Sequence, residues 1–466
     1  MPARARLTIR SPASRSSHGR PGRSSVWLLG LGLALVVCGL APAAGASDVE
    51  LAQEDRIAEL ERKLDALADE LERSRTQGAL PDQNLEGFWG LGPAASKVYA
   101  LSRGVTLGGY AEGRYTAHVS DKGGNQNEID ALRAVLYVGY KFNDWLVWNS
   151  EIEIEHASTS EDGSVSLEFA ALDFLFHPAL NARVGLLLSP MGFLNEVHEP
   201  PFYFGTHRPE VARRIIPTTW RENGFGIFGE LWGGKISYRL YGINGFDATG
   251  FSPSGLRGGR QKGSKALAED FAFVGRLDWT PFPEFLLGAS VYAGDSGQDQ
   301  RLDVKNSSGV VVDIADIPNA ATTIWEVHAQ LRTRGWQLRA LFAQAHVSDA
   351  GDLSRALEAL GDLNTGQAVA SKMLGGYAEI AYDVWPLLAP GSPMSLEPFY
   401  RFGFVDTQRD IPTGFAKDEA QNDEFHTLGF SFKPVPNVVL KADYRNRSAE
   451  QGGLSDEINL GVGLVF

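Results

Sequence analysis

The last ten residues, Glu457–Phe466, read EINLGVGLVF and decide the fold of the chain. Large apolar side chains occupy every second position, while the positions between them are small or polar until Val465. A period of two residues is that of a β-strand with one apolar face and one wet face. The chain therefore ends in a predicted half-wet strand, whose apolar face carries Ile458, Leu460, Val462, Leu464 and Phe466.

The same alternation recurs along most of the chain from residue 105 onward. Each segment is about ten residues long, the length of a tilted strand that crosses a bilayer. We predict about sixteen such strands, starting near residues 105, 131, 145, 165, 181, 224, 235, 270, 284, 322, 336, 373, 395, 424, 437 and 457.

The connections between these strands alternate in length. Short turns lie at 143–144, 178–180, 233–234, 281–283, 335, 386–393 and 434–436, and long loops at 119–130, 158–164, 190–223, 246–269, 295–321, 348–372, 406–423 and 448–456. A soluble β-sandwich has no reason to separate its loops by length. Short turns at one end and long loops at the other are typical of an outer-membrane barrel.

The polar face of the predicted strands is too rich in charge to be buried or to face lipid. We therefore expect an all-β, transmembrane antiparallel barrel whose apolar face contacts lipid and whose charged face lines a water-filled lumen. Aromatic residues such as Trp145, Phe176, Trp232 and Trp279 cluster beside the short turns, as an interfacial girdle would. The alternative is that these aromatics are scattered core residues.

Residues 1–46 read as a secretory signal peptide. Six arginines and no acid precede an apolar run from Val26, which ends in Ala44-Gly45-Ala46. Cleavage there would remove the single cysteine, Cys38, and export the remainder. An uncleaved membrane anchor is the alternative.

Residues 47–77 are predicted to form a coiled-coil helix, because leucines and one isoleucine recur at spacings of three and four between charged residues. The alternative is a single amphipathic helix that lies on its own protein. Residues 78–102 are rich in Gly, Pro and Ala and read as a linker, which leaves 103–466 for the barrel.

Composition and missing motifs exclude several functions. The net charge of −14 disfavours a nucleic-acid partner, and a single long apolar run excludes a helical multi-span membrane protein. The chain has neither a nucleotide-binding loop nor a G-x-S-x-G elbow, so we predict that it is not an enzyme and has no cofactor. The acidic run Glu151, Glu153 and Glu155 is read as a wet lumen wall, so no metal site is predicted.

Signal peptide, strands and terminal aromatic together resemble a Gram-negative outer-membrane porin. More narrowly, 105–466 resembles the phosphate-selective porin O and P family. That resemblance rests on Ala182-Arg183-Val184-Gly185, Leu188-Ser189-Pro190-Met191-Gly192, Arg221-Glu222-Asn223-Gly224-Phe225-Gly226, Gly376-Tyr377-Ala378-Glu379 and Tyr400-Arg401.

The resemblance implies passive diffusion of small hydrophilic solutes, in some members anions such as phosphate, through a homotrimer in outer-membrane lipid. In that class the terminal aromatic, here Phe466, is the signal that the barrel-assembly machinery reads. Phosphate selectivity is not carried over, because the predicted pore lining mixes both signs of charge: Arg133, Arg183, Arg239, Arg276 and Arg401 with Glu151, Glu153 and Glu155.

The longest connection, 190–223, has the position of the third long loop, which in sixteen-stranded porins folds inward and narrows the pore. If it lines such a constriction, its cations would draw anions, since low-dielectric walls focus the field. The candidate constriction residues are His198, His207, Arg208, Arg213, Arg214 and Arg221. The alternative is a solvated loop whose charges pair locally.

Two other functions stay open. The chain could be a structural tether that uses the coiled coil, or an outer-membrane barrel enzyme whose nucleophile is not recognisable from the sequence.

Overall fold

The computed structural model describes residues 56, 59, 62, 63, 87–119, 126–157, 163–452 and 454–466. The chain divides into two compact units, 1–79 and 80–466, and only the second is described in detail. The predicted signal peptide lies outside the described residues, as does most of the predicted coiled coil, where Lys63 pairs with Glu59 at 2.7 Å. Within the described part of the chain, every helix is too short or too polar to span a membrane.

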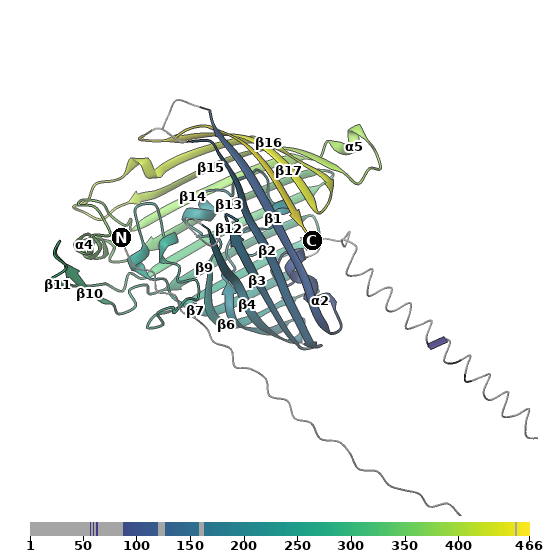
Figure 1. Cartoon of the computed structure of the whole chain (residues 1–466), viewed down its shortest axis with the longest axis horizontal. Helices are drawn as coiled ribbons and strands as arrows, with labels where there is room; N and C mark the ends of the chain where they lie inside the picture. Colours follow the sequence, from purple (N-terminus) through teal and green to yellow (C-terminus); the bar gives the residue numbers. More distant parts are fainter. Residues whose placement is uncertain are drawn as a thin grey trace, which may run out of the picture. The chain divides into compact units, whose positions relative to one another are not determined.

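Sixteen antiparallel strands close into one barrel, as the alternation predicts (Figure 1). Neighbours along the chain are neighbours in the sheet, and the first strand pairs with the last. The strands are β1 (Gly104–His118), β2 (Glu128–Asn143), β3 (Leu146–Glu155), β4 (Ser164–His177), β5 (Leu180–Leu188), β6 (Arg221–Leu231), β7 (Ile236–Asn244), β8 (Phe271–Phe282), β9 (Phe285–Gly294), β12 (Thr322–Thr333), β13 (Trp336–Val347), β14 (Lys372–Tyr382), β15 (Ser395–Asp410), β16 (Asn422–Val435), β17 (Val438–Ala449) and β18 (Glu457–Val465).

The segregation of loop lengths is also confirmed. Most turns at one end join strands through two to four residues; the longer one, between β14 and β15, holds α5 (Trp385–Leu388). The long loops at the other end carry α4 (Ala350–Leu360) and a hairpin of β10 (Arg301–Lys305) and β11 (Val311–Asp316), which the alternation did not predict (Figure 1). Short 3-10 turns lie at Ala248–Gly250, Arg257–Gly259 and Glu419–Gln421.

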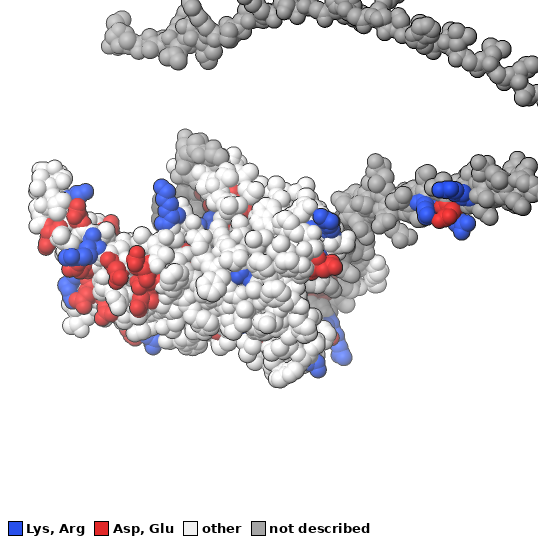
Figure 2. All heavy atoms as spheres, turned by 90° about the horizontal axis from the view of Figure 1, so that it is seen from below, with Lys and Arg blue, Asp and Glu red and all other residues white. Residues whose placement is uncertain are grey.

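The two faces of the wall differ as expected. Along β18, Ile458, Leu460, Val462 and Leu464 are exposed, whereas Asn459 is fully buried inside the barrel. Figure 2 shows the consequence: charged side chains gather mainly at the end that carries α4, β10 and β11, and are sparse over the middle of the wall. The exposed aromatics beside the short turns include Phe142, Trp145, Phe176, Trp232, Trp279, Phe282 and Trp336.

The last residue completes the closure of the barrel. The backbone N–H of Phe466 donates to the carbonyl of Gly109 at 2.9 Å, and the N–H of Gly109 donates back to the carbonyl of Phe466 at 2.9 Å. From there Tyr110 pairs with Val465, and β1 and β18 continue in register to His118 and Glu457. The Phe466 side chain stays half-exposed on the outer face.

A helix lies inside the barrel, within the segment that the sequence assigned to a linker. This helix, α2 (Pro93–Ala100), packs against β1, β2 and β3. Two contacts place it on the luminal wall: the Asn149 side chain donates to the Ala95 carbonyl at 2.7 Å, and Val98 covers Gly139. A Cβ at Gly139 would lie 2.8 Å from the Val98 Cβ, so only glycine permits this approach.

Candidate pore constriction

The connection between β5 and β6, residues 189–220, is termed the constriction loop. Asn195 joins its two ends: its side-chain amide donates to the carbonyls of Ser189 (2.5 Å) and Trp220 (2.9 Å) and accepts from the Trp220 N–H (2.6 Å). Trp220 is fully buried and stacks on Phe246 with ring centroids 4.5 Å apart, beside Tyr292. The loop therefore leaves the wall from a fixed root.

The first half of the loop crosses toward β7, β8 and β3. The carboxylate of Glu196 lies 3.5 Å from the Arg239 guanidinium and 3.6 Å from that of Arg276. The His198 Nε2 lies 3.2 Å from a carboxylate oxygen of Glu151. The next residue, Glu199, accepts the backbone N–H of Ala94 at 3.2 Å, so that the loop also holds the start of α2.

The apex of the loop includes the 3-10 turn Pro200–Phe202 and is held through its backbone carbonyls. The Lys441 ammonium donates to the carbonyls of Tyr203 (2.9 Å) and Gly205 (2.8 Å). Arg401 donates to the carbonyl of Phe204 at 2.6 Å. Arg401 lies on β15 and Lys441 lies on β17. Both point into the lumen, and both donate hydrogen bonds to the loop instead of standing as free charges.

The second half contains the short helix α3 (Val211–Arg214) and reaches β16 and β17. Glu210 pairs at 2.7 Å with both Arg445 and Arg213. Burial acts to raise the pKa of Glu210, but the two guanidinium groups outweigh it and lower that pKa to about 2. Arg214 pairs with Asp423, so the loop contacts strands on both sides of the lumen.

The structure separates the predicted constriction cations. Arg213 is exposed, whereas Arg214 is buried against β16. Arg221 lies at the start of β6 rather than in the loop, and it pairs with Glu168 on β4. Arg208 is half-buried in the loop, and its positive charge favours the ionised form of Glu151 at the luminal wall.

The two predicted histidines of the loop are not cations at neutral pH. Burial, with the nearby Arg208, lowers the pKa of His198 to about 3. Burial and the charge of Arg445 hold the pKa of His207 well below its usual range, although Glu457 lies 3.6 Å from its Nε2. Neither side chain therefore adds a positive charge to the lumen under ordinary conditions.

Each predicted pore-lining arginine has an acidic partner on its own or a neighbouring strand. The pairs are Arg133 with Glu112 (2.9 Å) and Glu153 (3.6 Å), Arg183 with Asp173 (2.7 Å), Arg239 with Asp278 (2.5 Å), Arg276 with Asp278 (2.8 Å), and Arg401 with Glu379 (2.8 Å). Of the remaining predicted acids, Glu151 is buried behind the loop, while Glu155 is half-exposed and accepts from Ser164. The predicted pore-lining arginines are therefore paired with acids on the barrel wall and do not form a row of free cations.

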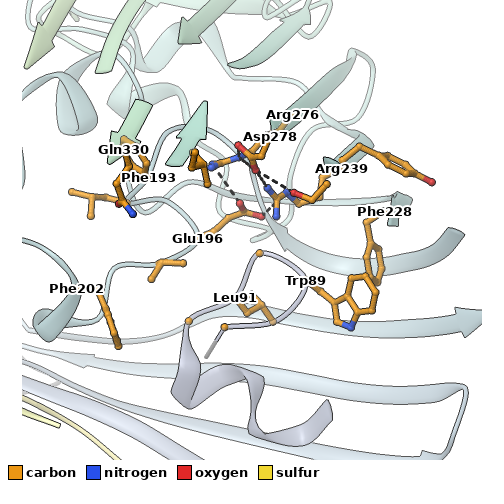
Figure 3. A pocket seen from close by; sticks show the side chains of 18 of the residues that line it. Trp89, Leu91, Phe193, Glu196, Phe202, Phe228, Arg239, Arg276, Asp278 and Gln330 are labelled. Atoms are coloured by element: carbon orange, nitrogen blue, oxygen red, sulfur yellow. Dashed lines mark hydrogen bonds and ion pairs between the residues drawn. The ribbon is translucent and has the colours of Figure 1, made fainter. Parts of the chain in front are cut away.

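A cavity of about 370 Å³ lies on the short-turn side of the loop (Figure 3). Its lining is apolar at Trp89 and Phe228, whose rings meet edge to face at 5.4 Å, and at Phe193. In Figure 3 the charged groups of Glu196 and Arg239 lie together on one side of this cavity, with Arg276 and Asp278. Residues 87 and 89–93 form another part of its wall.

Sequence reasoning missed several residues of this site. Asp278 alternates correctly with its neighbours and could have been found as the partner of Arg276, two residues earlier on the same face. Lys441 follows the alternation of its strand, but the pattern does not mark it as a hydrogen-bond donor to loop carbonyls. The position of Trp89 in the cavity wall could not be predicted from the sequence, because it depends on how the segment before β1 enters the barrel.

The comparisons with known proteins support this architecture. No family model matches the chain. An uncharacterised protein from Aquifex aeolicus (strain VF5) is 38% identical over 364 residues, which cover 77% of this chain and 79% of the relative.

Two solved structures share the fold at a TM-score of 0.50. One is a loop L8 deletion mutant of OmpT, an outer membrane protein of Vibrio cholerae, at 11% identity over 78% of this chain and 100% of the other. The second is Salmonella typhi OmpF in complex with daunomycin, at 15% identity over 78% of this chain and 98% of the other. At these identities the likeness shows the porin fold, while membership of the phosphate-selective porin O and P family stays a prediction.

Proposed function

The chain belongs to the same protein family as the Aquifex aeolicus relative, and on the basis of its porin fold we propose that it is an outer-membrane porin. In this proposal it forms a channel for passive diffusion of small hydrophilic solutes and does no covalent chemistry. The observation that carries the proposal is the constriction loop, which crosses the lumen of a closed barrel and contacts β1, β3, β7, β8 and β12–β17.

The width of the proposed passage is set by the loop. A sixteen-stranded wall encloses space for an aqueous channel. Here the loop apex, tied by Lys441 and Arg401, and the helix α2 on the wall of β1, β2 and β3 occupy part of that space. The cavity of about 370 Å³ between them and the short turns supports a passage for small solutes.

A preference for anions would depend on the cations left without an acidic partner. The guanidinium of Arg332 lines the cavity and makes no ion pair among the described residues. Arg208 likewise has no described ion pair within 4.0 Å. We propose a weak anion preference from these two groups, with phosphate as one candidate solute.

The proposal includes the route to the membrane. The signal peptide 1–46 would direct export, the exposed apolar wall would contact outer-membrane lipid, and Phe466 would present the barrel-assembly signal. A homotrimer is proposed because porins commonly assemble in this way, as the resemblance implies.

Single-channel conductance in planar bilayers tests the proposal. The full-length protein is refolded in detergent, and heat-modifiable migration on a gel verifies that the barrel has formed. Stepwise conductance from the folded protein is expected. Folded, inserted protein without conductance would refute the porin and favour the structural tether, while turnover of a lipid ester would favour the barrel enzyme.

A further inference from the structure

Three potential metal ligands meet behind the constriction loop. They are Glu151 on β3, Glu168 on β4 and His198 in the loop, and one ligand atom of each lies within 4.8 Å of the others. All three side chains are at most 1% exposed. None of the three is part of the cavity lining in Figure 3.

A β-bulge aims the second carboxylate into this cluster. Glu151 pairs with Phe169 and Ile152 pairs with Leu167, so Glu168 is the extra residue of the bulge. Phe169 and Glu168 are both buried, while Leu167 is exposed on the outer face. A bulge is a common device for re-aiming a side chain beside a functional site, and this one puts Glu168 next to Glu151.

Several polar atoms of the cluster remain without a hydrogen-bond partner. Glu168 receives a hydrogen bond from Arg221 on one oxygen, and Glu151 faces His198 with one oxygen. The other oxygen of Glu151, the other oxygen of Glu168 and the Nδ1 of His198 are buried and lack a well-formed hydrogen bond to a described residue, although Thr219 and Glu153 lie near the Glu168 carboxylate and the Asn195 backbone lies near His198. Burying such groups without partners is costly, so the cluster needs a ligand that accepts their lone pairs.

The surrounding charge favours a cation as that ligand. Arg133 is shared by Glu112 and Glu153, and Arg221 is engaged by Glu168. Arg208 is a further electrostatic neighbour of Glu151, and so is Glu199, which adds negative charge and has Lys97 as its own cationic neighbour. At contact distance among the described residues, the two carboxylates of the cluster, Glu151 and Glu168, share a single guanidinium, that of Arg221, which leaves a negative charge for a cation to balance.

We propose that Glu151, Glu168 and His198 bind a divalent transition-metal ion of the zinc class. An imidazole with two carboxylates suits Zn²⁺ and its first-row neighbours, whereas Ca²⁺ and Mg²⁺ prefer oxygen ligands alone. Zn²⁺ ligands lie ~2.0–2.2 Å from the ion. Binding therefore draws the ligands together and fastens the loop, through His198, to β3 and β4.

The test measures zinc itself on the full-length protein, refolded in detergent without a histidine tag and stripped with a chelator. Isothermal titration with Zn²⁺ alone is expected to show one saturable site per chain. His198→Gln and Glu168→Gln are expected to weaken it at least tenfold, since removing a ligand leaves two. The matched control is His207→Gln, which changes the other histidine of the loop.

Either of two titration results would overturn the proposal. One is a folded wild-type protein with no saturable Zn²⁺ binding, in which case Arg208 compensates the carboxylates. The other is equal loss of binding in His207→Gln. X-ray absorption of the zinc-loaded wild type needs no variant. A spectrum with one imidazole among oxygen ligands of the zinc supports the site, and a spectrum without an imidazole ligand refutes it. Conductance is measured separately, so failure here leaves the porin proposal standing.

Discussion

Replacing Asn195 by alanine should loosen the root of the constriction loop. Asn195 is 1% exposed, and its side chain makes three hydrogen bonds of 2.5–2.9 Å with Ser189 and Trp220. A buried hydrogen bond contributes ~1 kcal/mol net, so the loss is about 3 kcal/mol for the closed root. At 1.4 kcal/mol per factor of ten, the equilibrium for local opening rises by about a hundredfold.

Hydrogen exchange followed by mass spectrometry measures this change. In Asn195→Ala the amides of Ser189 and Trp220 should exchange about a hundredfold faster than in the wild type, while barrel strands keep their protection. Asn364→Ala is the matched control, because Asn364 is exposed in a long loop and bonds only to Gln367. If both variants exchange like the wild type, the ion pairs between the loop and the barrel wall are enough to hold the loop, and our reasoning about its root is wrong.

Three further predictions follow from the loop and α2. Gly139→Ala places a Cβ 2.8 Å from that of Val98, so α2 should leave the wall and the single-channel conductance should rise. An unchanged conductance would contradict the proposal that α2, on the luminal wall, narrows the passage. The pKa of Glu210 is lowered from 4.5 to about 2, so the ionised Glu210 stabilises the loop fully above pH 4.5, and this stabilisation is lost as the pH falls toward 2. Hydrogen exchange of the loop amides should accelerate over that range, and Glu210→Gln should abolish the acceleration. Arg208→Gln should reduce the anion preference in reversal-potential measurements more than Arg213→Gln, because Arg213 is exposed and paired; equal effects would argue against a role for Arg208 in the passage.

The strands were predictable because one physical requirement governs every residue of the wall. Alternation of lipid-facing and lumen-facing side chains, as in Leu460 and Asn459, is written directly in the sequence. The number of strands, their order and the side of each loop follow from that alternation and from loop length.

The site was less predictable, because its contacts join residues far apart in the chain. The sequence around Lys441 does not predict its hydrogen bonds to the carbonyls of Tyr203 and Gly205. The sequence around Glu168 does not predict the bulge that turns this residue inward. The prediction that 190–223 folds inward came from the resemblance to porins, and the contacts of the loop agree with it. Which arginines face the passage depends on three-dimensional pairing, as the contrast between Arg213 and Arg214 shows.

The seam between β1 and β18 has a consequence for how the chain acquires its structure. Its partners come from the two ends of the barrel sequence, so the slowest contact to form is also the one that covers both open edges. Until Phe466 pairs with Gly109, the edge of β1 has unpaired backbone groups that another chain can pair with. A chain truncated before β18 is therefore expected to accumulate as an aggregation-prone open sheet, so the last strand protects the folding chain as well as completing the folded barrel.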